Sequence, residues 1–252
     1  MTIHMFGAYF GLALSYVLGE PIDEGHEETM EPDKESDLFA LVGTTLLWVY
    51  WPSFVGATET SILENEKHCI TNTILALLSS TTMTFYLSHK LTHSNKFDPV
   101  HVANSTLAGG VAIGSTGRLN IGPGAAIIVG MFAGVASVYG YVYSSPYLES
   151  KYKIYDTCGV GNLHGYPSIV GGILSIIYVT LDADAEFLHY NMFQQMIRQF
   201  LGIIITLVIS ITSGYGTGLL VTTKLNEDNN DESESKMKKT YHDKVWWHTE
   251  YY

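Results

Sequence analysis

Charged residues are unevenly distributed along this chain of 252 residues, and their distribution restricts the possible folds more than any single motif does. Aspartate, glutamate, lysine and arginine are absent from seven stretches of at least 19 residues, namely 1–19, 38–58, 69–88, 99–117, 119–148, 157–181 and 199–223. A helix of about 20 predominantly apolar residues is long enough to cross a bilayer. We therefore predict an all-α polytopic membrane protein with about seven transmembrane helices. A soluble chain with this pattern would need an implausibly large dry core.

Average composition does not decide between a soluble and a membrane protein, because 46% hydrophobic residues and a mean hydropathy of +0.14 fit either class. The net charge of −12 comes mostly from residues 20–37 and from the segment after 223, so it does not describe one acidic surface. Cys69 and Cys158 lie at or within apolar runs and predict neither a disulfide framework nor a zinc site. The sequence has no nucleophile–base spacing, phosphate loop or cluster of metal ligands. We therefore expect no enzyme activity, no catalytic residue, no cofactor or metal, and no nucleic-acid partner.

Lysine and arginine predict the orientation of the helices, because loops on the cytoplasmic side of a membrane carry more of them. If the C-terminal segment is cytoplasmic, the opposite face holds only one lysine and two arginines. We predict a membrane domain at 1–223 and a cytoplasmic tail at 224–252, whose mixed charges are typical of disorder. Seven crossings then place Met1 outside the cell without a preceding signal peptide. This suggests further helices upstream, and a chain that is the C-terminal part of a larger protein.

Three aspartates begin uncharged runs that cross in the same direction. Asp37 precedes the second run, Asp98 the fourth and Asp156 the sixth, all on the predicted cytoplasmic side. An aspartate at a helix N-terminus can simply accept hydrogen bonds from free backbone N–H groups. The three carboxylates could equally form an acidic inner mouth that attracts cations, and the sequence leaves both interpretations open.

Two histidines lie deep within uncharged runs. His164 follows Asp156 by eight residues, about 12 Å along a helix, and so lies near the middle of a bilayer core about 30 Å thick. A titratable imidazole at that depth should face a cavity rather than lipid. His4, in the first run, also has no carboxylate near it in the sequence. A single buried histidine is more often a packing residue, but two at comparable depth favour a shared pathway, with Asn162 as a candidate for its lining.

Phe54 follows Asp37 by 17 residues, about 25 Å along a helix, which predicts a position near the outer leaflet. Trp48, Tyr50 and Trp51 precede it, and rings at this depth are typical of an interfacial aromatic belt. A phenylalanine that closes the outer mouth of a pore is the more specific alternative.

Four segments of the chain resemble the Rhesus (Rh) glycoprotein branch of the ammonium transporter superfamily. They are MTIHMFGAYFG at 1–11, SDLFA at 36–40 continuing to WPSF at 51–54, Asp98 with HVANSTLAGG at 101–110, and DTCG at 156–159 with NLHG at 162–165. Their order and spacing are similar to those of the family, over residues 1 to about 223. The resemblance implies a bundle of about eleven or twelve helices built from two inverted repeats, of which this chain is the C-terminal portion. It also implies a homotrimer or hetero-trimer in the lipid bilayer, with one pore per subunit.

The resemblance assigns roles to individual residues. In such proteins two histidines share a hydrogen bond within an otherwise apolar pore, and the matching positions are His4 and His164. A phenylalanine gate at the outer mouth matches Phe54, whereas the second gate phenylalanine of the family would precede Met1. The cytoplasmic acids of the Rh branch match Asp37, Asp98 and Asp156.

These matches imply a plasma-membrane channel for ammonia and ammonium, with methylammonium as an analogue. A bare cation in an apolar lumen is costly, whereas neutral NH3 can pass along imidazoles that donate, accept and exchange protons. A channel for CO2 or another neutral gas is one alternative. A non-transporting membrane scaffold or fragment is the other, although the presence of both histidines counts against it.

Overall fold

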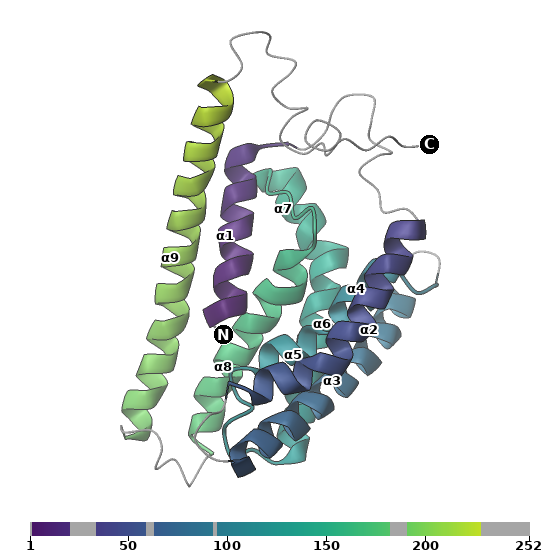
Figure 1. The fold of residues 1–252 in the computed structure, drawn as a ribbon, viewed down its shortest axis with the longest axis vertical. Helices are drawn as coiled ribbons and strands as arrows, with labels where there is room; N and C mark the ends of the chain where they lie inside the picture. Colours follow the sequence, from purple (N-terminus) through teal and green to yellow (C-terminus); the bar gives the residue numbers. More distant parts are fainter. Residues whose placement is uncertain (1, 21–33, 59–62, 93–94, 182–190, 228–252) are drawn as a thin grey trace.

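The computed structural model describes residues 2–20, 34–58, 63–92, 95–181 and 191–227, and these form an all-helical bundle (Figure 1). The helices are α1 (Thr2–Leu18), α2 (Lys34–Gly56), α3 (Leu63–Leu91), α4 (Pro99–Ser105), α5 (Ala108–Ile113), α6 (Pro123–Tyr139), α7 (Ser145–Tyr152), α8 (Tyr166–Val179) and α9 (Met192–Glu227). Two π-helical turns, η2 (Gly140–Ser144) and η3 (Gly161–Gly165), join α6 to α7 and lead into α8. The described residues contain no strand, as the sequence predicts.

Each of the seven uncharged runs carries one helical rod, because α4 with α5, α6 with η2 and α7, and η3 with α8 are continuous or nearly continuous pieces. Three rods in the described part of the chain are long and apolar enough to cross a membrane, namely Lys34–Gly56, Pro123–Tyr152 and Met192–Thr223. The helix α1 is apolar but shorter, α3 is rich in serine and threonine, and the fourth rod is interrupted. Uneven hydropathy among rods is expected where some helices are enclosed by others.

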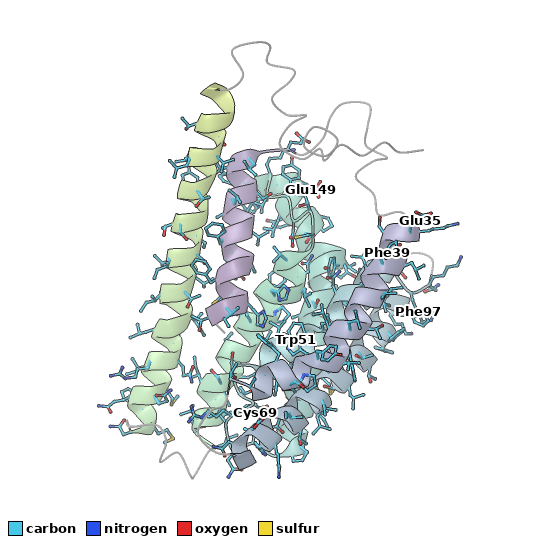
Figure 2. All side chains as sticks on the ribbon, in the orientation of Figure 1. Glu35, Phe39, Trp51, Cys69, Phe97 and Glu149 are labelled. Atoms are coloured by element: carbon cyan, nitrogen blue, oxygen red, sulfur yellow. The ribbon has the colours of Figure 1, made fainter. Side chains whose placement is uncertain are left out.

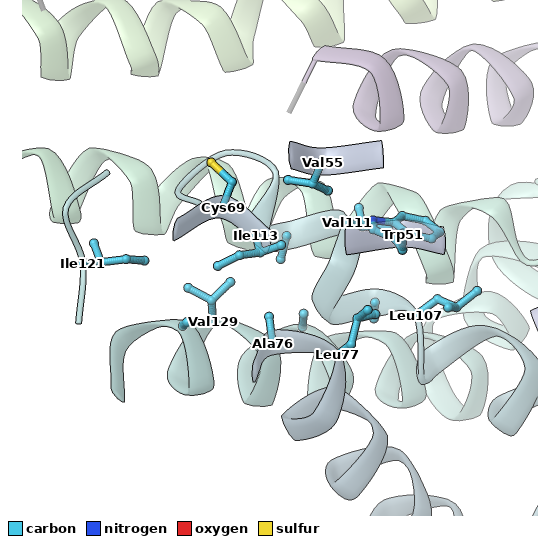
Figure 3. Packing of buried hydrophobic residues seen from close by; sticks show 14 of the residues in the cluster. Trp51, Val55, Cys69, Ala76, Leu77, Leu107, Val111, Ile113, Ile121 and Val129 are labelled. Carbon is cyan, nitrogen blue, oxygen red and sulfur yellow. The ribbon is translucent and has the colours of Figure 1, made fainter. Parts of the chain in front are cut away.

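The largest group of helices packs around α3 (Figure 1). Gly109 of α5 and Gly130 of α6 both lie against the backbone carbonyl of Ala76, where a Cβ atom would have no room. Small residues let helices approach closely in lipid, where apolar side chains gain little from leaving their surroundings. Figure 3 shows the apolar core that results, with Ala76 and Leu77 of α3 beneath Trp51 of α2 and Val111 of α5, and Val129 of α6 roughly level with Ala76.

The fourth rod is interrupted between α4 and α5, and hydroxyl groups from neighbouring helices satisfy its exposed carbonyls. Ser80 of α3 donates a hydrogen bond of 2.8 Å to the Thr106 carbonyl, and Thr44 of α2 donates one of 2.7 Å to the Ala103 carbonyl. An unsatisfied carbonyl in a bilayer is costly, so irregular backbone persists only where protein groups replace water. The interruption is therefore built into the packing of three helices.

A second group consists of α1, α8 and α9, with α1 packed along α9 (Figure 1). Gly214 of α9 lies against the Phe10 backbone, and Gly218, one turn later, lies against the Val17 side chain. The outer faces of the bundle remain apolar, because Phe39 of α2 is 75% exposed and Leu220 of α9 is 70% exposed. Apolar surface of this extent on helical rods is suited to lipid.

The tail predicted at 224–252 starts within the last helix, because α9 extends to Glu227. The remaining residues of the tail lie outside the described part of the chain, and its disorder stays a prediction.

Candidate functional site

The two predicted histidines meet in the interior although 160 residues separate them in the sequence. His4 lies in the first turn of α1, and His164 lies in η3. Their ring centroids are 5.0 Å apart, and the ring planes differ by 9°. Both side chains are partly buried, and the Nδ1 atom of His164 is buried without a hydrogen-bond partner among the described residues. The bundle therefore brings together the pair that the sequence singled out.

The hydrogen bond that the resemblance implies between the two histidines stays a prediction. Nearly parallel planes with centroids 5.0 Å apart fit rings that lie edge to edge as well as rings that overlap, and Nδ1 of His164 has no hydrogen-bond partner among the described residues. An unpaired ring nitrogen is available to a polar guest. The Nδ1 atom of His164 is such a group.

Trp51 extends this stack, so its expected place in an interfacial aromatic belt is wrong. Its ring centroid lies 5.6 Å from that of His4 and 6.5 Å from that of His164, at interplanar angles of 20° and 16°. The side chain is 7% exposed, and its Nε1 lies against Gly110 of α5, where any Cβ would clash. Figure 2 shows Trp51 in the middle of the bundle, far from the charged ends. Its spacing of three residues before Phe54 was the available signal.

Phe54 lies one ring further along this series. Its ring meets that of Trp51 edge-on, with centroids 6.4 Å apart and an interplanar angle of 81°. It lies near the end of α2 and is 50% exposed. A ring that borders the buried stack and also faces outward has the position that the predicted gate requires, and the gating role itself stays a prediction.

Asn162 is buried on the opposite side of η3 from the histidine stack. Its Nδ2 donates a hydrogen bond of 2.8 Å to Ser145 Oγ of α7, and its side-chain oxygen faces Gly140. That oxygen has no hydrogen-bond partner among the described residues, and the residue is 1% exposed. The structure therefore does not bring Asn162 beside His4, and it gives this candidate a contact with the α6–α7 rod instead.

Two of the three predicted acids accept hydrogen bonds from backbone N–H groups. Asp98 is the N-cap of α4, and its Oδ1 accepts from the N–H groups of Val100 and His101. Asp156 precedes η3 and accepts bonds of 2.8 Å from the N–H groups of Val160 and Gly161. Capping is thus part of the role of both residues. It does not conflict with an acidic mouth, because a capping carboxylate keeps its charge.

The three acids share one end of the bundle, where α2 and α4 begin and α7 ends. Figure 2 shows Glu35 and Glu149 at this end, which we call the acidic end. Asp37 is partly buried in the first turn of α2. Burial raises the pKa of the Asp156 carboxyl, and hydrogen bonds from Gly161 and Val160 oppose part of that rise. The charge of Asp156 is therefore held in place at an energetic cost.

The family model for the Ammonium Transporter Family matches residues 1–245. The chain belongs to this family. It is 36% identical over 260 residues to ammonium transporter Rh type B of Sus scrofa, a match that covers 98% of this chain and 55% of that protein. The chain thus spans about half the length of the curated relatives it matches.

Solved structures show the fold of the family over the same part. The channel Rh50 of Nitrosomonas europaea, of the Rhesus protein family, superposes with a TM-score of 0.75 at 39% identity, covering 88% of this chain and 54% of Rh50. Mep2 of Saccharomyces cerevisiae superposes with a TM-score of 0.69 at 19% identity, covering 92% of this chain and 54% of Mep2, which supports the fold alone. The helices of this membrane protein therefore have the ammonium transporter fold, over about half the length of these neighbours.

Proposed function

We propose that this chain carries one wall of an Rh-type channel that conducts ammonia and ammonium past His4 and His164. The observation that carries the proposal is the buried stack of Trp51 with these two histidines. A neutral NH3 molecule needs both hydrogen-bond donors and acceptors, and a neutral imidazole offers one nitrogen of each kind. The ring faces and the indole exclude water from the same space, which disfavours a bare cation.

The acids and Phe54 complete the pathway in this proposal. Asp37, Asp98 and Asp156 attract ammonium to the acidic end, where a proton can be released before passage. Phe54 borders the stack toward the other end and limits access from there. Methylammonium is expected to follow the same route. The membrane in question is the plasma membrane, the acidic end faces the cytoplasm with the tail, and subunits assemble as a homotrimer or hetero-trimer.

The proposal is tested by methylammonium flux into proteoliposomes. Two proteins are reconstituted, the chain of 252 residues and the same chain preceded by the N-terminal half of the porcine Rh type B relative. His164→Asp is compared with His89→Asp, because His89 is exposed near the end of α3 and makes no contact with the stack. We expect His164→Asp to lower flux by about tenfold or more, since an unpaired carboxylate in an apolar lumen is costly. The His89 variant should conduct like the parent.

The alternatives give different outcomes in the same vesicles. Equal flux in the His164→Asp variant and the parent would rule out the histidine pathway. A protein that carries CO2 but ignores methylammonium would be a neutral-gas channel. A protein that carries neither, although it is correctly folded, would be a membrane scaffold.

A further inference from the structure

His101 is the most deeply buried histidine in the described part of the chain, and the proposed pathway leaves it without a role. It lies in α4 and is 5% exposed. Its Nδ1 is 3.1 Å from Ser88 Oγ of α3, and the same oxygen accepts a hydrogen bond of 2.9 Å from the Asp98 backbone N–H. Because Ser88 Oγ accepts from Asp98, its own proton is free to point at Nδ1. His101 thereby orients the Ser88 hydroxyl, whose oxygen binds the backbone N–H of the capping residue Asp98.

The ring of His101 also lies beside the ring of Tyr141, which belongs to η2. The two ring centroids are 5.4 Å apart. The Tyr141 hydroxyl donates a hydrogen bond of 3.3 Å to the Gly159 carbonyl, and Gly159 closes a turn on the carbonyl of Asp156. Gly159 has a φ of +70°, and a Cβ there would collide with the Tyr141 hydroxyl, so only glycine fits.

These contacts form one continuous chain between two acids on different rods. It runs from the Asp98 cap through Ser88, His101 and Tyr141 to the turn that begins at Asp156. The two acids otherwise belong to separate pieces of backbone, the start of α4 and the loop before η3.

We propose that His101 is a positioning residue that, with Ser88 and Tyr141, fixes the Asp156 turn relative to the Asp98 cap. The effect of this positioning on cation recruitment at the acidic end rests on the proposed function. Its effect on the order of the Asp156 turn does not. Removing the connection therefore loosens that turn whether or not the protein conducts.

The backbone N–H groups of Val160 and Gly161 provide a direct probe of the turn. Both are hydrogen bonded to the Asp156 carboxylate in the closed turn. The rate at which deuterium labels these two N–H groups in the purified chain measures how often the turn opens. Tyr141→Phe removes only the hydroxyl, and Tyr139→Phe makes the same change at an exposed ring on the same rod. We expect labelling of the Tyr141 variant to be about three to ten times faster, and labelling of the Tyr139 variant to be unchanged.

Substitution of His101 tests the other end of the connection. His101→Leu removes the ring contact and the nitrogen, His101→Asn restores an acceptor near Ser88, and His89→Leu is the exposed control. We expect faster labelling with Leu and partial recovery with Asn. If His101→Leu does not fold, the nearly isosteric Tyr141→Phe still decides the question. Labelling rates equal to those of the controls in the Tyr141 and His101 variants would overturn the proposal.

Methylammonium flux separates positioning from a general loss of structure. A displaced acid should raise the apparent KM several-fold and leave the maximal rate within about twofold. A fall in the maximal rate at unchanged KM would mean that His101 only supports the fold, and would overturn its link to recruitment. Absence of flux in the parent protein would refute the proposed function, while the labelling rates would still decide the positioning role.

Discussion

Gly140→Ala should disturb the chain at the point where its two π-helical turns touch. A Cβ on Gly140 would lie 2.9 Å from Tyr166 Cδ2, and closer still to Asn162 Oδ1. Neither neighbour can swing away freely. Asn162 is held by its bond to Ser145, and the Tyr166 hydroxyl is hydrogen bonded to Ser144. Both anchors belong to the α6–α7 rod or its π turn, so the added methyl must push η3 as a whole.

The size of the effect follows from these distances. Ordinary carbon–carbon contacts are about 3.5 Å or longer, so the Tyr166 ring must retreat by at least about 0.6 Å. Gaps of that size forfeit a quarter to a half of the dispersion energy of the neighbouring contacts. Overpacking of a well-packed interior typically costs about 1–3 kcal/mol. We therefore expect Gly140→Ala to lower the free energy of unfolding by about 2 kcal/mol, a factor of about 30 in the unfolding equilibrium.

This change is measured by titrating the purified chain in detergent with SDS. Unfolding is monitored as the loss of the helical circular dichroism signal. Gly124→Ala is the matched control, because it makes the same substitution on α6 where no atom lies within 4 Å of the new methyl. The double variant with Asn162→Ala tests the cause, since removing the amide oxygen should recover about 1 kcal/mol through coupling. Equal midpoints for the Gly140 and Gly124 variants, or strictly additive effects in the double variant, would refute the reasoning.

Three further changes have expected results. Asp98→Ala should lower the free energy of unfolding by about 0.5–2 kcal/mol because α4 loses its cap, with Asp98→Ser close to the parent in the same SDS titration. Ser80→Ala leaves the Thr106 carbonyl without its donor and should cost about 0.6 kcal/mol and at most about 1.7, again by SDS midpoint. Burial raises the pKa of Asp156 above its ordinary 3.8, so the folded state holds this proton more tightly than the unfolded state does. The free energy of unfolding should therefore fall as pH rises from about 3.8 to the raised pKa. Asp156→Asn should remove this part of the pH dependence, and an unchanged pH profile would contradict it.

The distribution of charge was sufficient to predict the rods but not their interruptions. Seven uncharged runs become seven rods because a bilayer-length helix must exclude charge, whatever its other residues. The gap after Ser105 has no proline or charge to signal it. It depends on hydroxyls that Thr44 and Ser80 supply from other helices, and no local pattern encodes that. Tertiary contact therefore decides where the fourth rod stops being regular.

The site was predictable where depth alone decided it. His164 was found because an imidazole eight residues beyond an acid lies deep in the membrane, and His4 was found through comparable depth. The directions in which the side chains point were harder to predict. Asn162 and His164 are two residues apart, and residues at that spacing point to different sides of a helix, so Asn162 faces α7 while His164 faces α1. Trp51 was missed because its apolar surroundings in the sequence fit an interfacial belt as well as the interior of the bundle, and only its spacing from Phe54 distinguished the two.

The partners of α1 have a consequence for the order in which the protein is made. The helix emerges from the ribosome well before the residues that it contacts. Ser15 donates a hydrogen bond to the Tyr155 carbonyl, His4 stacks on His164, and Phe10 packs on Gly214. At about 5–20 residues per second, the 160 residues between the two histidines take about 8–30 s to synthesise. During that interval α1 lies in the membrane without these contacts, shielded by lipid or by the insertion machinery. Its stable position in the bundle then depends on helices that are synthesised later.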